Sequence, residues 1–210
     1  MSFDLQDQWT TLATHFTNDG TFVVTLWEEI EAAYSHKSRH YHNLAHIESM
    51  LKQANEQKHQ LIDVPEVLLA IWYHDIIYKA TRQDNEEKSA VFAKNRLKIL
   101  GLQQEKIEKC SKLIISTKRH ETLFLQDSDN QWLLDFDLSI LGSNWETYQR
   151  YVGQIRKEYH IYPDFIYKKG RKKVLQQFLE RKRLYFTDMY FERLEEKARL
   201  NIERELELLS

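Results

Sequence analysis

Apolar residues recur along this chain at intervals of three and four, the spacing that places side chains on one face of an α-helix. Two such stripes open the chain, with Gly20 between them. Their members are Leu5, Trp9, Leu12 and Phe16, then Phe22, Leu26, Ile30 and Ala33. No run alternates in polarity for long enough to predict a sheet. The pattern therefore predicts an all-α helical bundle.

The same periodicity and its breakers predict the remaining helices. They are expected over about residues 43–59, from Pro65 through 78, over 85–100, around 107–117, over 128–142 and 145–159, and as two long charged helices within 163–210. Asp84 or Asn85 can cap the helix that starts near residue 85, and Gly101 can end it. A break between the last two helices is expected near Phe186 and Thr187.

Length and composition set the domain organisation. The chain has 210 residues with only five glycines and two prolines, which favours long helices over a turn-rich fold. We expect a single domain, with a core over about residues 20–160 and C-terminal helices over about 161–210 that pack on it. A chain of this size can bury a core without disulfides or a structural metal, so a bound metal would serve function.

Charge and cysteine content limit the expected binding partners and the expected cellular compartment. The formal net charge is -2, which argues against a polycation built to bind nucleic acid. Cys110 is the only cysteine, and it lies on an apolar stripe typical of a buried, inert thiol. The start of the chain lacks the pattern of a secretory signal, and no stretch of eighteen apolar residues predicts a membrane span. We expect a cytoplasmic protein.

The segment WYHDIIY, residues 72–78, places a charged Asp75 beside His74 in an apolar helix. Burial of an unpaired carboxylate costs several kcal/mol, so Asp75 needs a cation or strong hydrogen bonds. Neighbouring residues of a regular helix point about 100° apart, so both bind one ion only across a helix edge or at a loosened helix end. The alternative is a buried His–Asp pair or a helix cap.

The segment RHYHNLAHI, residues 39–47, contains two histidines four residues apart, His42 and His46. That spacing puts both on one helix face, where imidazoles bind several transition metals. The segment lacks the glutamate of a zinc-protease motif. The alternative is a polar helix start with solvated histidines.

The segment LLDFDLSILG, residues 133–142, places Asp135 and Asp137 in an otherwise apolar helix. In a helix the two carboxylates point to nearly opposite sides, so at most one faces a shared pocket. The alternative is a pair of structural carboxylates.

Together these segments give the order His, then His-Asp, then Asp, which resembles the HD superfamily of metal-dependent phosphohydrolases. More narrowly, the chain is similar to the compact bacterial group of predicted metal-dependent HD phosphohydrolases. The matching stretches are YHNLAHI, WYHDIIY, DNEEKSA, DFDLSILG and GRKKVLQQFL. In that pattern His46 is the first metal ligand, His74 and Asp75 form the doublet, and Asp137 is the last ligand, with Asp135 as the alternative.

The resemblance implies an HD-domain-like helical fold with one metal ion, sometimes two, in a cleft between helices. It also implies hydrolysis of phosphate esters, often in nucleotides, so the expected partner is a small phosphorylated substrate and a nucleic acid is not expected. A divalent ion lowers the pKa of bound water and draws charge off a phosphoryl oxygen. Mn, Fe, Co, Ni, Zn and Mg all suit such a ligand set. The alternative function is a non-catalytic metal or nucleotide sensor on the same fold.

Further residues are candidates to complete the site. Asp84 and Glu86 could orient water or protonate the leaving oxygen, or could only cap the following helix. Five residues are candidates for contact with substrate, namely Arg39, His42, Lys118, His120 and Arg171. His120 stands where many HD proteins carry an extra histidine. For Lys118 and His120 the alternative is a favourable interaction with a helix dipole, and for Arg171 it is a solvated helix face.

Overall fold

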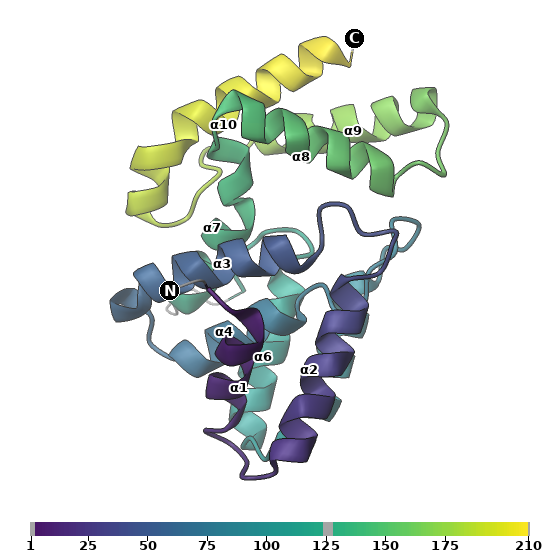
Figure 1. Cartoon of the computed structure of the whole chain (residues 1–210). Helices are drawn as coiled ribbons and strands as arrows, with labels where there is room; N and C mark the ends of the chain where they lie inside the picture. The colour runs from purple at the N-terminus through teal and green to yellow at the C-terminus, as the bar shows by residue number, and fades with distance from the viewer. Residues whose placement is uncertain (1–2, 124–127, 210) are drawn as a thin grey trace. The chain divides into compact units, whose positions relative to one another are not determined.

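The computed structural model describes residues 3–123 and 128–209, and these form ten α-helices and two short 3₁₀-helices with no strand (Figure 1). The all-α prediction is therefore confirmed. The contacts divide the chain into two compact units, residues 1–133 and 134–210, and each is described by itself. The expected single domain, with its core over about 20–160, stays a prediction.

The first unit contains six α-helices, and α7 crosses into the second unit. The elements are α1 (Leu5–Ala13), α2 (Gly20–Tyr34), α3 (Leu44–Glu56), η1 (Lys58–Gln60), α4 (Val64–Tyr73), α5 (Asn85–Leu100), α6 (Gln104–Ser116) and α7 (Ser128–Leu138). Helix α6 packs against both α4 and α5, α3 packs against α4, and α1 packs against α2. Helix α4 is thus surrounded by neighbours, as its nearly continuous apolar sequence requires.

Local capping sets several helix ends. The side chains that precede α1, α2 and α3 each accept a hydrogen bond from a backbone N–H of the first turn, and they are Asp4, Asp19 and Asn43. Gly101 ends α5 with φ of 95°, the left-handed conformation that glycine adopts at no steric cost. The predicted helix stop at Gly101 is confirmed.

An aromatic cluster forms the core of the first unit. The ring of Trp72 meets those of Trp9 and Trp27 edge-on, with centroids 5.8 and 6.1 Å apart. The indole N–H of Trp9 donates to the carbonyl of Val23 at 3.0 Å. Cys110 is also fully buried, as its apolar stripe predicts. This packing fixes α4, which leads directly to His74 and Asp75.

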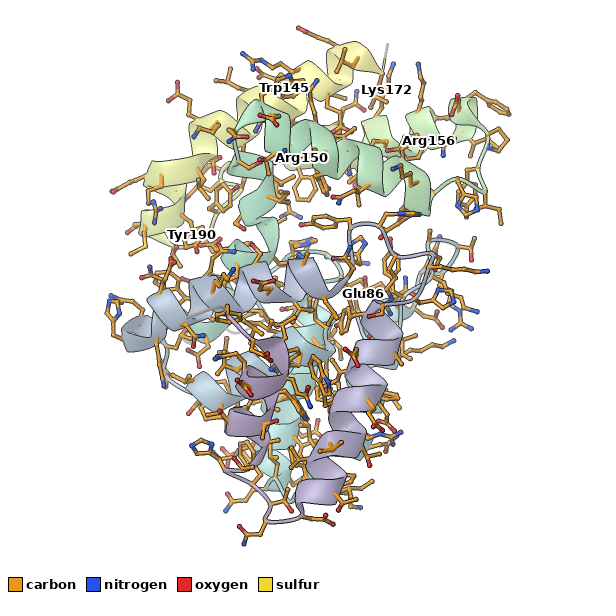
Figure 2. The ribbon with its side chains drawn as sticks, in the orientation of Figure 1. Glu86, Trp145, Arg150, Arg156, Lys172 and Tyr190 are labelled. Atoms are coloured by element: carbon orange, nitrogen blue, oxygen red, sulfur yellow. The ribbon has the colours of Figure 1, made fainter. Side chains whose placement is uncertain are left out.

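The second unit contains η2 (Ser139–Gly142), α8 (Trp145–Glu158), α9 (Asp164–Leu179) and α10 (Asp188–Leu208). Figure 2 shows Arg150 and Arg156 on α8. Helix α10 packs closely on η2, where a Cβ at Gly142 would lie 2.6 Å from the Cβ of Leu194. The two charged C-terminal helices are separated as predicted near residues 186–187. Among the described helices, none combines the length and apolar character that crossing a membrane requires.

Candidate metal centre

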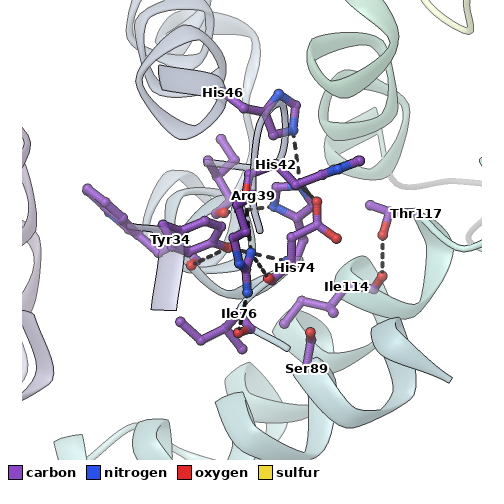
Figure 3. A network of polar contacts seen from close by, with 12 residues as sticks. Tyr34, Arg39, His42, His46, His74, Ile76, Ser89, Ile114 and Thr117 are labelled. Carbon is purple, nitrogen blue, oxygen red and sulfur yellow. Dashed lines mark hydrogen bonds and ion pairs between the residues drawn. The ribbon is translucent and has the colours of Figure 1, made fainter. Parts of the chain in front are cut away.

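Three buried side chains of the first unit converge where α3 passes the end of α4. His46 projects from α3, and His74 and Asp75 follow Tyr73, the last residue of α4. The Nε2 atoms of His46 and His74 lie 3.3 Å apart, and Nε2 of His74 lies 3.0 Å from Oδ2 of Asp75. The three side chains offer ligand atoms that all lie within 4.8 Å of one another. The structure therefore brings these three predicted ligands together (Figure 3).

The end of α4 allows adjacent residues to face one centre. The expectation that this helix runs through residue 78 is wrong, because its last helical residue is Tyr73. The backbone N–H of Asp75 donates to the hydroxyl of Tyr34 at 3.3 Å. His74 keeps helical dihedral angles, with φ of -58° and ψ of -38°, and its N–H still donates to the carbonyl of Ala70. The doublet therefore lies at the helix end, one of the two placements from which adjacent side chains can reach a single ion.

A hydrogen bond fixes the protonation pattern of His74. Its Nδ1 lies 2.9 Å from the carbonyl oxygen of Ile71, which can only accept, so Nδ1 carries a proton. In the neutral imidazole, Nε2 then presents its lone pair to His46 and Asp75. Metal-binding histidines are commonly oriented by this kind of bond through the other ring nitrogen.

The converging acceptors suit a divalent cation. One proton links a single pair of these atoms at a time, whereas a metal ion binds all three together. Bonds of about 2.0–2.2 Å to a metal separate neighbouring ligand atoms by roughly 2.8–3.6 Å in tetrahedral or octahedral geometry. The separations of 3.0 and 3.3 Å fall within that range. Two imidazoles and a carboxylate form a mixed donor set that accepts several transition metals.

Side chains of α5 hold the segment that follows the doublet. Ser89 accepts a hydrogen bond from the N–H of Ile77 and donates one to its carbonyl. Asn85 binds the N–H and the carbonyl of Lys79 in the same manner. Both residues lie in the stretch DNEEKSA, where sequence reasoning gave Asn85 only a capping role and did not single out Ser89. Their spacing of four along one helix face was the available signal.

The predicted cap of α5 is therefore corrected. Asp84 occupies the N-cap position but makes no side-chain capping bond, and the side chain of Asn85 binds the preceding loop. Asp84 instead pairs with Lys88 at 2.9 Å. That hydrogen bond is the main reason why the pKa of Asp84 is lowered.

Glu86 differs from Asp84 in its environment. It lies in the first turn of α5, where Figure 2 labels it, and it is half-buried. Burial is the largest cause that raises the pKa of Glu86, and the nearby charge of Asp75 raises it further. Of the two predicted proton-transfer carboxylates, Glu86 is therefore the one electrostatically coupled to the metal centre.

Arg39 is buried, and its guanidinium donates to three backbone carbonyls. Nη1 lies 3.1 Å from the carbonyl oxygen of His42 and 2.6 Å from that of Asp75, and Nη2 lies 2.9 Å from that of Ile76. Three of its five N–H groups therefore bind the protein backbone. The contact of Arg39 with substrate stays a prediction.

Three other predicted substrate residues belong to the first unit. The ring of His42 stacks on that of Tyr78 with centroids 4.2 Å apart. Lys118, just after α6, pairs with Glu87. His120 adopts the left-handed backbone conformation, with φ of 47°. The contact of all three with substrate stays a prediction.

Three predicted residues belong to the second unit. Asp135 is fully buried and accepts hydrogen bonds from the N–H groups of Phe186 and Thr187 and from the hydroxyl of Thr187. Arg171 binds both carboxylate oxygens of Glu205 at 2.7 and 3.0 Å. These contacts give Asp135 the structural role that the sequence left open as its alternative. For Arg171 the alternative of a solvated helix face is wrong, because its side chain is 9% exposed and paired with a buried carboxylate. Its contact with substrate stays a prediction.

Asp137 is half-buried on α7. Its charge contributes to the raised pKa of Tyr151, for which burial is the largest cause. The assignment of Asp137 as the last metal ligand stays a prediction.

Comparison of the chain with protein-family models, with curated proteins and with solved structures finds no match in any of the three. The resemblance to the HD superfamily therefore stays a prediction from the motifs. The convergence of His46, His74 and Asp75 is a separate observation, which depends on the fold alone.

Proposed function

We propose that this protein is a metal-dependent phosphohydrolase that acts on a small phosphorylated substrate, such as a nucleotide. The observation that carries the proposal is the convergence of two imidazole nitrogens and a carboxylate in the first unit. Their order along the chain supports the assignment to HD-type hydrolases, as opposed to other metalloenzymes. His46, His74 and Asp75 would hold the ion.

A divalent ion held by these residues supplies Lewis-acid stabilisation of a phosphoryl oxygen and lowers the pKa of a water molecule. The chain's own residues prepare the site for it. The bond from His74 to the carbonyl of Ile71 keeps Nε2 available as a ligand. Glu86, with its raised pKa, is suited to hold a proton and to deliver it to the leaving oxygen of the ester.

The sequence pattern adds Asp137 as a further metal ligand. Substitution of Asp137 and of Asp135 tests which of the two aspartates binds the ion. If Asp137 binds the ion, Asp137→Asn lowers metal affinity. The Asp135→Asn variant lowers stability instead, because the carboxylate of Asp135 accepts bonds from Phe186 and Thr187. Isothermal titration with Mn²⁺ and urea unfolding separate the two effects.

The proposal is tested with metal-free protein prepared by chelation. Mn²⁺, Co²⁺, Ni²⁺, Zn²⁺ or Mg²⁺ is added back singly, and phosphate release is followed over a panel of nucleotides and other phosphate monoesters and diesters. We expect turnover that requires added metal and that falls at least about a thousandfold in Asp75→Asn, in line with the loss of a metal's catalytic contribution. The control is Asp63→Asn. The carboxylate of Asp63 binds Lys109 at 2.6 Å, and Asp63 precedes the first residue of α4, at the opposite end of that helix from His74 and Asp75.

Full activity in Asp75→Asn, or turnover in the metal-free protein, would rule out this function. Tight metal binding without hydrolysis of any ester would favour the alternative of a non-catalytic sensor. Absence of metal binding in the wild-type protein would reduce the cluster to a buried His–Asp pair.

A further inference from the structure

Arg39 connects the two chain segments that carry the candidate metal ligands. One of its carbonyl partners belongs to His42, four residues before His46, and the other two belong to Asp75 and Ile76. Among the described residues Arg39 makes no ion pair with a carboxylate. Its charge is matched instead by carbonyl dipoles and by the faces of two tyrosine rings.

The two rings hold the guanidinium in place. Its central carbon lies 4.8 Å from the ring centroid of Tyr34 and 5.6 Å from that of Tyr78. Tyr34 also accepts the hydrogen bond from the backbone N–H of Asp75 and donates to the carbonyl of Trp72. The peptide groups on both sides of the Asp75 Cα are therefore fixed, one by Tyr34 and the other by Arg39. Figure 3 shows Arg39 and Tyr34 beside His74.

We infer that Arg39 is a positioning residue of the metal centre, which aims the Asp75 carboxylate at the ion and sets its distance from His46. The inference rests on the proposed function in so far as the cluster binds a metal. The last carbonyls of a helix lack partners within the helix, and a cation at that end is favourable. Arg39 supplies such a cation where α4 ends, and it thereby keeps the released backbone in one conformation.

The planar guanidinium is what this role requires. It presents donors in a rigid fork that reaches three carbonyls at once, whereas a lysine ammonium is a compact charge on a flexible stem. Arg39→Lys therefore keeps the charge and loses the geometry. This variant distinguishes positioning from a simple electrostatic effect.

The second unit offers a matched control. Arg199 donates to the carbonyl of Leu179, the last residue of α9, and to that of Arg181 just after it, and it also binds Glu195. Arg199→Lys therefore disturbs the same kind of contact in a place that carries none of His46, His74 and Asp75.

The test compares Co²⁺ binding to the wild-type protein, Arg39→Lys and Arg199→Lys, without substrate. Titration gives the affinity, the visible absorption of bound Co²⁺ reports the ligand geometry, and urea unfolding reports stability. We expect Arg39→Lys to weaken Co²⁺ binding roughly ten- to a hundredfold, the range found for residues that orient metal ligands, and to alter the Co²⁺ spectrum. We expect Arg199→Lys to lower the urea midpoint and to leave both Co²⁺ signals unchanged.

An Arg39→Lys variant with wild-type Co²⁺ affinity and spectrum would overturn this inference alone. Equal changes in Arg39→Lys and Arg199→Lys would also overturn it, since they would indicate a general loss of stability. A wild-type protein that binds Co²⁺ but hydrolyses no ester overturns the proposed function and leaves the inference standing. A wild-type protein that binds no metal overturns both.

Discussion

Two buried polar clusters, one in each unit, are arranged in contrasting ways. In the second unit, Arg171 and Glu205 form a bidentate pair with side chains 9% and 1% exposed, and the hydroxyl of Tyr148 donates to the same carboxylate at 2.6 Å. Each charge there faces an opposite charge or a donor. In the first unit, His46, His74 and Asp75 bring two imidazole nitrogens and a carboxylate oxygen within 4.8 Å of one another.

The contrast shows how a buried carboxylate in a candidate metal centre differs from one in a structural ion pair. A buried carboxylate with its own cation and donors, such as Glu205, is accounted for by folding alone. The Asp75 carboxylate lies instead in a group of three possible metal-ligand atoms, with the imidazole of His74 at 3.0 Å. The mutual arrangement of the neighbours, and not burial by itself, separates a candidate metal centre from a structural ion pair.

The largest expected effect concerns the buried pair of the second unit. Glu205→Ala leaves the guanidinium of Arg171 buried without its partner, and we expect a loss of about 3–5 kcal/mol in the free energy of unfolding. Urea unfolding measures the loss. The exposed pair of Arg150 and Glu146 serves as the control, and Glu146→Gln is expected to cost at most about 0.5 kcal/mol. Equal losses of unfolding free energy in the two variants would show that the buried ion pair contributes no more to stability than the exposed one.

The next effect concerns metal and stability in the first unit. At a metal concentration one hundred times the dissociation constant, binding to the folded state adds about 2.7 kcal/mol to the free energy of unfolding. We expect this gain in the wild-type protein and its loss in His74→Ala, measured by thermal unfolding with and without Mn²⁺. A chelator should reverse the gain. A His74→Ala variant that is still stabilised by Mn²⁺ would place the metal elsewhere.

A smaller effect is expected at Ser89, which holds the loop after the doublet. Ser89→Ala removes the partner of both backbone groups of Ile77, and we expect a loss of about 1–3 kcal/mol in the free energy of unfolding. Thr25→Ala, which removes an exposed hydroxyl on α2, should change stability by no more than about 0.5 kcal/mol. If Ser89→Ala is as stable as the wild type, the loop is held by other contacts.

The last prediction concerns the reactivity of Cys110, a buried group that lies outside the candidate metal centre. Burial raises the pKa of its thiol well above the usual range, and Sγ donates to the carbonyl of Glu66. The thiolate, which is the reactive form, is therefore scarce at pH 8. We expect an aromatic disulfide reagent to react at least about a hundredfold more slowly with the folded protein than with urea-unfolded protein, since exposure requires unfolding. Equal rates would show that Cys110 is accessible.

The sequence by itself determined the helical class, most helix positions and the three residues that meet in the candidate metal centre. Apolar periodicity and caps such as Asn43 and Gly101 act within a few residues, so they can be read from a short stretch of chain. The need of the charged Asp75 for a cation or strong hydrogen bonds also follows from its apolar surroundings in the sequence.

Only the tertiary structure decided the end of α4, the role of Arg39 and the role of Asp135. Arg39 reaches a carbonyl 36 residues away, and Asp135 accepts bonds from an N–H 52 residues away. The sequence around a charged residue does not indicate which distant backbone group that residue will bind. The fold selects these partners because each buried donor and acceptor must be satisfied once the helices have packed.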